Sequence, residues 1–562
     1  MKRTLHLALA CAGVCIGITA NAQRYVTEVF NNDQIVVTPD VIYGTNIDFL
    51  TSNLGTPNLV AEITALQTAV STGQSIPAAY FNPGDPSTGL KVTNLRMDVY
   101  QPDQSVDEVE ARPVVLYLHT GNALPPPVNG SPNGTRKDST AVEFCKQFAR
   151  RGYVAISMSY RLGWNPLAAT EQQRRGQLLN AIYRAIHDVR HNLRSLKQGA
   201  LAGTNPYGIC PDRIIVVGEG TGGYISLANA TLDRPSELYI EKFLPNPFDP
   251  TTSYVDSTQV GNIHGLGGNL NLYRPNGFDY ETQFCVNLGG ALADTSWLAP
   301  GDPAMVAFHT AFDPFAPFTE GIVIVPTTGG PVVPVQGSNL FMQLVNSYGN
   351  NDGFASIPGG DPYTDRARAL YGTSVSHGTT TVNINSGVEG LFPVIRPFWP
   401  APASEEASPW QWWDPNSPIA QTVVSQGPPP ITAHIASLAS NPDMSPVKAR
   451  AYIDTIMGYL NPRINLALDL GSTCIITGVP ESTSLEAAVE VFPNPAQRDF
   501  TIASSAAAIR RYAIYDVDSR LVRTNTVNSD RVTIAREQLK AGVYFVELTF
   551  DDGVVTRKLI LE

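Results

Sequence analysis

The ten residues from Ile214 to Gly223 constrain the fold more than any other stretch of the chain. They read Ile-Ile-Val-Val-Gly-Glu-Gly-Thr-Gly-Gly. Four consecutive β-branched residues predict a strand that is buried on both faces. The glycines that follow predict a sharp turn, because glycine adopts backbone conformations that other residues avoid. Gly223 allows a helix to pack closely against that strand. We therefore expect a strand, a tight turn and a helix, with Gly220 at the apex of the turn.

This turn matches the pattern G-x-S-x-G, in which a serine at the apex acts as a nucleophile. Gly218 and Gly222 hold the flanking positions, and Gly220 holds the serine position. Glycine has no side chain, so the apex cannot attack a carbonyl group. Thr221 is an alternative nucleophile, although that register places Glu219 where the turn favours a small residue. A phosphate-binding loop does not fit, because no Lys-Ser or Lys-Thr pair follows.

Composition and the N-terminus restrict the possible partners. The 562 residues carry a formal net charge of −12, so nucleic acid is not expected as a partner. Residues 1–22 have the basic start, apolar run and small-residue end of a signal peptide. No other stretch is long and apolar enough to span a bilayer. We expect an exported soluble protein with no transmembrane segment in the mature chain.

The cysteines leave several possibilities open. Cys145, Cys210, Cys285 and Cys474 remain once the leader is removed. Four thiols allow three pairings, and the sequence does not choose among them. Export favours a disulfide, while buried free cysteines are equally compatible. The spacing does not resemble a metal site, so we expect neither a metal nor a cofactor.

Strand and helix patterns alternate over residues 24–471. Apolar runs predict strands at 112–119, 153–160, 213–218, 284–288 and 304–308, and helical periodicity marks 139–151, 170–199, a segment starting at Thr221, and 446–470. Such alternation predicts an α/β domain with a mostly parallel central sheet. A weaker run at Thr379–Ile384 is expected to be the last strand of this sheet.

The pattern changes near the C-terminus. Residues 472–486 have the composition of a linker, and short strand-like runs separated by turn residues follow over 487–562. The runs are 489–492, 500–502, 512–516, 532–534, 542–550 and 554–561. They predict a small all-β sandwich as a second domain.

Several segments in order resemble the carboxylesterase/lipase branch of the α/β-hydrolase fold. They are Asp98-Val99-Tyr100-Gln101-Pro102, Leu118-His119-Thr120-Gly121, Tyr160-Arg161-Leu162-Gly163, Asp188-Val189-Arg190, Pro211-Asp212-Arg213-Ile214 and the turn at Gly220. The resemblance covers residues 89–320. It implies an α/β-hydrolase fold and carboxylic ester chemistry, with the nucleophile position vacated.

The same resemblance implies roles for further residues. Asp313, in Phe308-His309-Thr310-Ala311-Phe312-Asp313-Pro314, takes the position of the catalytic acid; the alternative is an aspartate that caps a turn. The histidine base should follow the last strand, and the loop after Ile384 holds none. His377 and His434 are the candidates, and the base is otherwise missing. Thr120, Gly121 and the N–H of Thr221 are expected to form the oxyanion hole.

The C-terminal residues resemble the type A sorting domain of the type IX secretion system. The resemblance rests on Val491-Phe492-Pro493-Asn494-Pro495, Tyr515-Asp516, Leu539-Lys540-Ala541-Gly542-Val543-Tyr544 and Lys558-Leu559. It implies that the secretion machinery binds residues 487–562. The protein would then pass through the periplasm and be secreted or held at the cell surface.

Three tryptophans lie close together at Trp410, Trp412 and Trp413. If exposed, they could stack on a sugar or polymer ligand. The favoured interpretation is that they pin a long loop to the core, because exposed aromatic patches are uncommon on monomeric proteins.

Three functional hypotheses follow. The first is an exported, carboxylesterase-like protein that is catalytically impaired and binds a small-molecule or polymer ligand outside the cell. The second is an active ester hydrolase that uses Thr221 or another nucleophile. The third is a surface scaffold or adhesin, since a fold alone does not determine a function.

Overall fold

The computed structural model describes residues 24–201, 205–325, 329–395, 406–474, 488–516, 521–537, 539–550 and 553–562. The predicted signal peptide at 1–22 and most of the predicted linker lie outside these residues. The chain divides into two compact units. The larger, called here the hydrolase-like unit, comprises the residues up to Asn192, Pro206–Tyr273 and Thr282–Ile475. The other holds Ile476–Glu562 with the short segments Leu193–Asn205 and Arg274–Glu281.

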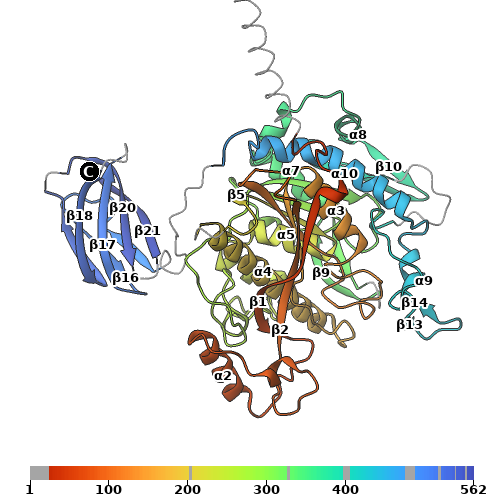
Figure 1. Cartoon of the computed structure of the whole chain (residues 1–562), viewed down its shortest axis with the longest axis horizontal. Helices are drawn as coiled ribbons and strands as arrows, with labels where there is room; N and C mark the ends of the chain where they lie inside the picture. The colour runs from red at the N-terminus through yellow and green to blue at the C-terminus, as the bar shows by residue number, and fades with distance from the viewer. Residues whose placement is uncertain are drawn as a thin grey trace, which may run out of the picture. The chain divides into compact units, whose positions relative to one another are not determined.

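An eight-stranded sheet forms the centre of the hydrolase-like unit (Figure 1). In spatial order the strands are β1 (Ile35–Ile47), β2 (Val92–Pro102), β4 (Val154–Met158), β3 (Arg112–Leu118), β5 (Ile209–Glu219), β6 (Phe284–Leu288), β7 (Ala304–Thr310) and β12 (Leu391–Val394). Strand β2 pairs antiparallel with both β1 and β4. All the other pairings, from β4 to β12, are parallel.

This strand order and the turn after β5 confirm the α/β-hydrolase fold implied by the sequence. Every residue of β3, β4 and β6 is buried, as expected for parallel strands that are covered on both faces.

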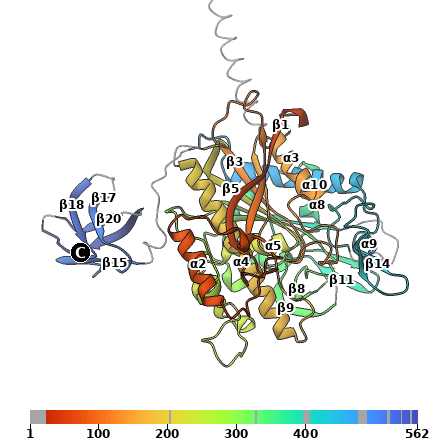
Figure 2. The same cartoon turned by 60° about the horizontal axis from the view of Figure 1, so that its bottom comes forward.

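Helices cover the sheet at the places that the sequence predicted. Helix α3 (Ser139–Arg150) packs on β4 and β2, and α10 (Pro446–Ala467) packs on α3 and β7 (Figure 1). Helix α5 (Thr221–Thr231) leaves the turn after β5 and packs against β5 and β6. The long helix α4 (Glu171–Leu201) lies beside the hairpin of β8 (Glu320–Ile324) and β9 (Pro331–Gln336) (Figure 2). The unit also contains α2 (Leu59–Ser71), α7 (Ser338–Ser347) and α8 (Pro362–Leu370), which the sequence analysis did not predict.

The prediction for the last strand of the sheet was wrong. The run at Thr379–Ile384 contains β11 (Thr380–Asn383), which pairs with β10 (Ser374–His377) in a separate hairpin. Its threonines are exposed, so the run does not supply a buried face. The last strand is β12, a fully buried Leu-Phe-Pro-Val segment at the sheet edge, where proline is tolerated. The loop that should carry a catalytic histidine therefore begins at Ile395.

The C-terminal residues form two small antiparallel sheets, as the sequence predicted. One sheet contains β15 (Val489–Phe492), β16 (Asp499–Ser504) and β19 (Arg531–Ala535), and the other contains β18 (Leu521–Ser529), β17 (Ile509–Asp516), β20 (Gly542–Phe550) and β21 (Gly553–Leu561). Phe500, Ile514 and Leu548 are among the side chains of their shared apolar core. The sequence analysis missed β18, whose polar run carries no apolar alternation.

One disulfide joins Cys210, at the start of β5, to Cys474, which follows α10. It closes a loop with a sequence separation of 264 residues. Cys145 and Cys285 are free and buried. The structure thus selects one of the pairings that the sequence left open. The disulfide links the strand before the Gly220 turn to the segment that follows α10.

Candidate functional site

The turn after β5 has the geometry of a nucleophile elbow. Gly220 has φ 52° and ψ −112°, a conformation that strains any residue with a side chain. Its N–H donates to the Leu288 carbonyl at 2.8 Å, and its own carbonyl accepts from the N–H of Gly223 at 2.9 Å. These bonds fix the apex between β6 and the first turn of α5. The backbone of the elbow is therefore formed, with a glycine at its apex.

The neighbouring glycines are required by close backbone approach. A Cβ on Gly218 would lie 2.0 Å from the Gly222 carbonyl oxygen, and one on Gly222 would lie 2.1 Å from that of Leu118. A Cβ on Gly223 would lie 2.3 Å from Asn287 Oδ1. The positions that flank the apex are thus Gly218 and Gly222, in the register that the sequence favoured.

Thr120 fills the space beside the vacated apex. A Cβ built on Gly220 would lie 2.4 Å from Thr120 Oγ1 and 3.2 Å from Thr120 Cβ. Thr120 follows β3, in the segment expected to supply the oxyanion hole. The sequence analysis assigned it only a backbone role, and nothing along the chain indicates this contact with a residue one hundred positions away.

The Thr221 side chain is hydrogen-bonded to the segment that contains Thr120. Its Oγ1 accepts a hydrogen bond from the Asn122 N–H at 2.7 Å, and the residue is 7% exposed. The side chain therefore engages a backbone donor next to Thr120 and Gly121, which together with the Thr221 N–H were predicted to form the oxyanion hole. Asn122 was not among the predicted site residues, because its contribution is a backbone N–H that any residue type could supply.

Asp313 lies just after β7, in the position expected for the catalytic acid. Its Oδ1 accepts from the N–H groups of Phe315 and Ala316 at 2.8 and 2.9 Å. Its Oδ2 has one long contact, 3.5 Å from Thr310 Oγ1. Burial raises the pKa of the Asp313 carboxyl to about 7, because the charged form loses its hydration.

The nearest histidine to Asp313 is committed to other partners. His309 Nε2 is 3.9 Å from Asp313 Oδ2, but it lies 3.0 Å from the Ala316 carbonyl oxygen, and Nδ1 lies 2.8 Å from Ser338 Oγ. We assign the proton to Nε2, since a carbonyl can only accept. Burial lowers the pKa of His309 to about 4, so the ring is neutral and forms no ion pair with Asp313.

Neither predicted candidate for the base lines the cavity beside Gly220. The His377 ring contacts Phe312, with their centroids 6.0 Å apart, on the β10–β11 hairpin. His434 lies in α9 (Ala433–Leu438) and accepts from Trp413 Nε1 at 3.1 Å. The chain from 395 to 413 contains no histidine. The geometry therefore offers no imidazole between Asp313 and the Gly220 turn among the described residues.

The three tryptophans are buried, in agreement with the favoured interpretation. Trp410 is 0%, Trp412 8% and Trp413 6% exposed. Trp410 Nε1 donates to Glu219 Oε1 at 3.1 Å, and Gln411 Nε2 donates to the same oxygen at 2.7 Å. The loop is thus fastened to the residue before the apex. Trp413 also lines the cavity, whereas Trp410 and Trp412 do not.

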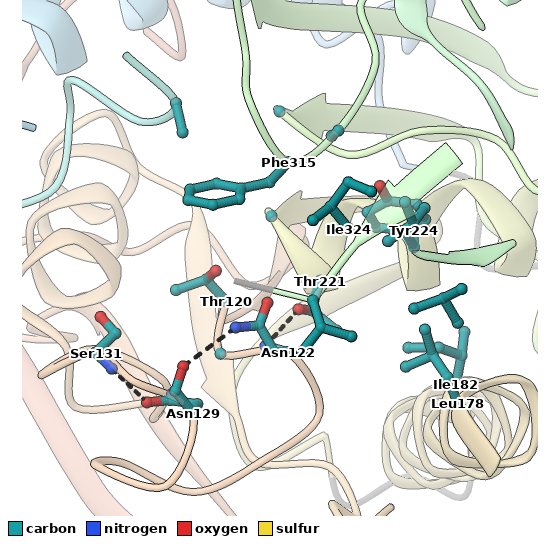
Figure 3. Close-up of a pocket in the computed structure, with 18 of the residues that line it drawn as sticks. Thr120, Asn122, Asn129, Ser131, Leu178, Ile182, Thr221, Tyr224, Phe315 and Ile324 are labelled. Carbon is teal, nitrogen blue, oxygen red and sulfur yellow. Dashed lines mark hydrogen bonds between the residues drawn. The ribbon is translucent and has the colours of Figure 1, made fainter. Parts of the chain in front are cut away.

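A cavity of about 500 Å3 opens beside the Gly220 turn. Figure 3 shows Thr120, Asn122 and Thr221 on its wall, with Leu178 and Ile182 of α4, Ile324 of β8 and Phe315 around it. Asn129 and Ser131 are among its polar lining residues, and Asn129 Oδ1 accepts from the Ser131 N–H at 2.8 Å. The apolar wall is made mainly of these side chains: Leu178, Ile182, Ile186, Leu232, Phe243, Val255, Trp297, Val323, Val325, Val332, Val333 and Val335.

The lining of this cavity is poor in ionisable side chains. Among the described residues that line it, Asp313 is the only aspartate, glutamate, lysine, arginine or histidine. No group of three or more histidines, cysteines or acidic residues that could hold a metal ion is found in the described part of the chain.

Comparison with known proteins characterises the C-terminus. Residues 490–562 match the family model of the secretion system C-terminal sorting domain. The chain ends in a sorting domain. This confirms the resemblance carried by Val491–Pro495 and implies export to the cell surface or beyond. No helix in the described residues is long and apolar enough to cross a membrane.

For the rest of the chain, the comparisons are weaker. No curated protein matches. A thermophilic esterase of the Planctomycetes species Thermogutta terrifontis with bound propionate is 16% identical, over 40% of this chain and 70% of the esterase, with a TM-score of 0.25. The same esterase phosphorylated by paraoxon is 16% identical, over 40% and 69%, with a TM-score of 0.25. MGS-M1, an α/β hydrolase enzyme from a Medee basin deep-sea metagenome library, is 15% identical, over 40% and 66%, with a TM-score of 0.23. The fold assignment follows from the strand order and the Gly220 turn.

Proposed function

We propose that the hydrolase-like unit is an exported ligand-binding protein that has lost ester hydrolysis. The observation that carries this proposal is the apex itself. Gly220 has no hydroxyl, and the space beside its α-carbon holds the Thr120 side chain. The cavity next to it has the size and apolar lining that are typical of small-molecule sites.

The side chains of Thr221 and Asp313 do not replace the missing nucleophile and base. A serine or threonine nucleophile must donate its O–H to a base. The one hydrogen bond that Thr221 Oγ1 makes among the described residues is accepted from the Asn122 N–H, and no basic group lies at its hydroxyl. Asp313, in the acid position, has only the His309 ring near it among the described residues, and that ring is bound to Ala316 and Ser338 rather than directed at the turn. An enzyme that lacks a triad member retains at most about 10³–10⁴-fold catalysis over water. Binding is therefore the function that this geometry supports best.

The sorting domain agrees with a role outside the cell. It would engage the type IX secretion machinery through residues 487–562, after a signal peptide at 1–22 has directed the chain to the periplasm. A small molecule, or the end of a polymer, would then meet the cavity at the cell surface or in the medium. An active ester hydrolase that uses Thr221 remains the alternative.

Ester hydrolysis separates these possibilities. We expect the purified mature protein to accelerate hydrolysis of short-chain p-nitrophenyl esters by no more than about 10⁴-fold over water. Thr221→Val should leave this rate unchanged, as should Thr64→Val on the exposed face of α2, the matched control. The readouts are the initial rate and the intact mass of the protein during turnover. An acyl adduct, or a rate that falls with Thr221→Val, would overturn the proposal in favour of the alternative.

Cavity filling tests the binding half of the proposal. Decanol should raise the melting temperature of the wild-type protein, because a ligand that binds the folded state stabilises it. Ile182→Trp, on the cavity wall, should abolish this rise. Leu167→Trp, at a residue that is 76% exposed, should retain it. A rise of equal size in both variants would place decanol elsewhere and contradict the proposal.

A further inference from the structure

We propose that the ligand is a cationic amphiphile, an apolar body with a protonated amine, and that Asp313 holds its amine inside the cavity. This inference rests on the proposed function and names the ligand class of that same site. It gives the acid position a new role, since the carboxyl that would have steered a histidine receives the ligand instead.

The geometry of Asp313 leaves an acceptor open toward a ligand. The side chain is 3% exposed to solvent and lines the cavity. Oδ1 is satisfied by two backbone N–H groups at 2.8 and 2.9 Å, so the carboxyl is held in one orientation. Among the described residues, Oδ2 accepts one hydrogen bond, a long one from Thr310 Oγ1 at 3.5 Å, and the His309 Nε2 atom lies 3.9 Å away. A carboxylate oxygen can accept more than one hydrogen bond, and Oδ2 therefore retains capacity for a donor from the cavity.

Space is also present next to this oxygen. Gly289, which follows β6, also lines the cavity. Even a Cβ added there would stay 3.9 Å from Asp313 Oδ2 and 3.6 Å from Trp410 Cζ2. With only hydrogen on the Gly289 α-carbon, a small head group has room to approach the carboxyl.

The protein supplies no charge to balance an ionised Asp313. Among the described residues, the only basic group within 4.0 Å of its carboxyl is His309, whose pKa is lowered to about 4 by burial, so it is neutral. Tyr224 faces it from α5, and burial raises the pKa of that hydroxyl, so it too is neutral. A buried carboxylate without a partner is costly, and a ligand cation would remove this cost.

The remaining wall favours an apolar body and disfavours an anionic head group. Aliphatic side chains of α4 and of the β8–β9 hairpin form a large part of its apolar surface, and Phe315, Tyr224 and Trp413 add aromatic rings, which attract cations as well. A fatty acid would place a second carboxylate in a cavity that has no described cation. The ligand class thus differs from the acid products of an ester hydrolase.

Three probes of equal chain length test the inference: decylamine, decanol and decanoate, titrated calorimetrically into the full-length mature protein. At about pH 8.5, where Asp313 is ionised, we expect decylamine to bind at least about tenfold more tightly than decanol. Decanoate should bind more weakly than decanol. In Asp313→Asn, decylamine and decanol should bind equally, and decanol should bind as it does to the wild type. The exposed Asp33→Asn should keep the preference and so control for the protein's overall negative charge.

The outcomes separate this inference from the proposal beneath it. If decanol binds and decylamine binds no more tightly, the inference fails and the binding function stands. If the amine preference persists in Asp313→Asn, its cause lies elsewhere and the inference is again overturned. If none of the three probes binds, the proposed function itself fails. Loss of the preference at about pH 5.5, where Asp313 is protonated, would support the inference.

Discussion

Gly222→Ala should lower the free energy of unfolding of the hydrolase-like unit by about 4 kcal/mol, because the added methyl group overlaps backbone atoms of a neighbouring strand. The added Cβ would lie 2.1 Å from the Leu118 carbonyl oxygen, 2.7 Å from its carbon and 2.9 Å from the His119 carbonyl oxygen. All three are backbone atoms, so no side-chain rotation can relieve the overlap. Strand β3 and helix α5 would have to separate, which would open the buried centre of the sheet.

Urea denaturation, followed by tryptophan fluorescence, measures this effect. The control is Gly353→Ala in the short helix η6 (Asp352–Ser356), where an added Cβ meets no atom within 4 Å. That substitution should leave the midpoint unchanged or raise it slightly, since alanine restricts the unfolded chain more than glycine does. Equal midpoints for the two variants would show that β3 and α5 are not in the close contact described here.

Asp313→Asn should stabilise the protein, and the gain should depend on pH. Burial raises the pKa of this carboxyl from 3.8 to about 7, a difference that corresponds to about 4 kcal/mol. Below both values the carboxyl is protonated in the folded and unfolded states, and no cost arises. As the pH rises through this range the folded state must either keep a proton that the unfolded state releases or bury a charge, so stability falls. Above about pH 7 the cost is complete.

The isosteric amide keeps an acceptor for Phe315 and Ala316 while it removes the charge. We therefore expect Asp313→Asn to exceed the wild type by about 4 kcal/mol at about pH 8.5 and by less than about 2 kcal/mol at about pH 5. Denaturant titrations at both pH values give these differences. Asp33→Asn, at an exposed position, should change stability by less than about 0.5 kcal/mol at either pH. A gain that does not vary with pH, or a loss at the higher value, would contradict an ionised Asp313 without a counter-charge.

Much of the fold could be predicted from the sequence because its signals are local. The apolar runs that became β3 and β5 are continuous, and the periodicity of α3 and α4 extends over several turns. The last strand was misplaced for a physical reason. The four residues of β12 are too few for a periodic pattern and include a proline, whereas the Thr380–Asn383 run is rich in β-branched residues but remains exposed in its own hairpin.

The candidate site, too, could be predicted only in part. Gly220 and Asp313 could be placed because each lies in a recognisable local segment. The contact of Thr120 with the apex and the hydrogen bond from Asn122 to Thr221 join residues about one hundred positions apart. The pairing of Cys210 with Cys474 spans a still longer separation. No pattern in the sequence predicts such contacts, because they depend on how the fold brings β3, β5 and α10 together.

The position of Thr120 also limits what a single substitution at the apex could achieve. Gly220→Ser would direct the new Cβ at the Thr120 hydroxyl, 2.4 Å away. Thr120 would have to rotate or be exchanged to make room, and the new hydroxyl would still need a base in hydrogen-bond reach. A redesign for hydrolysis must therefore change the apex, the residue that follows β3 and the surroundings of Asp313 together.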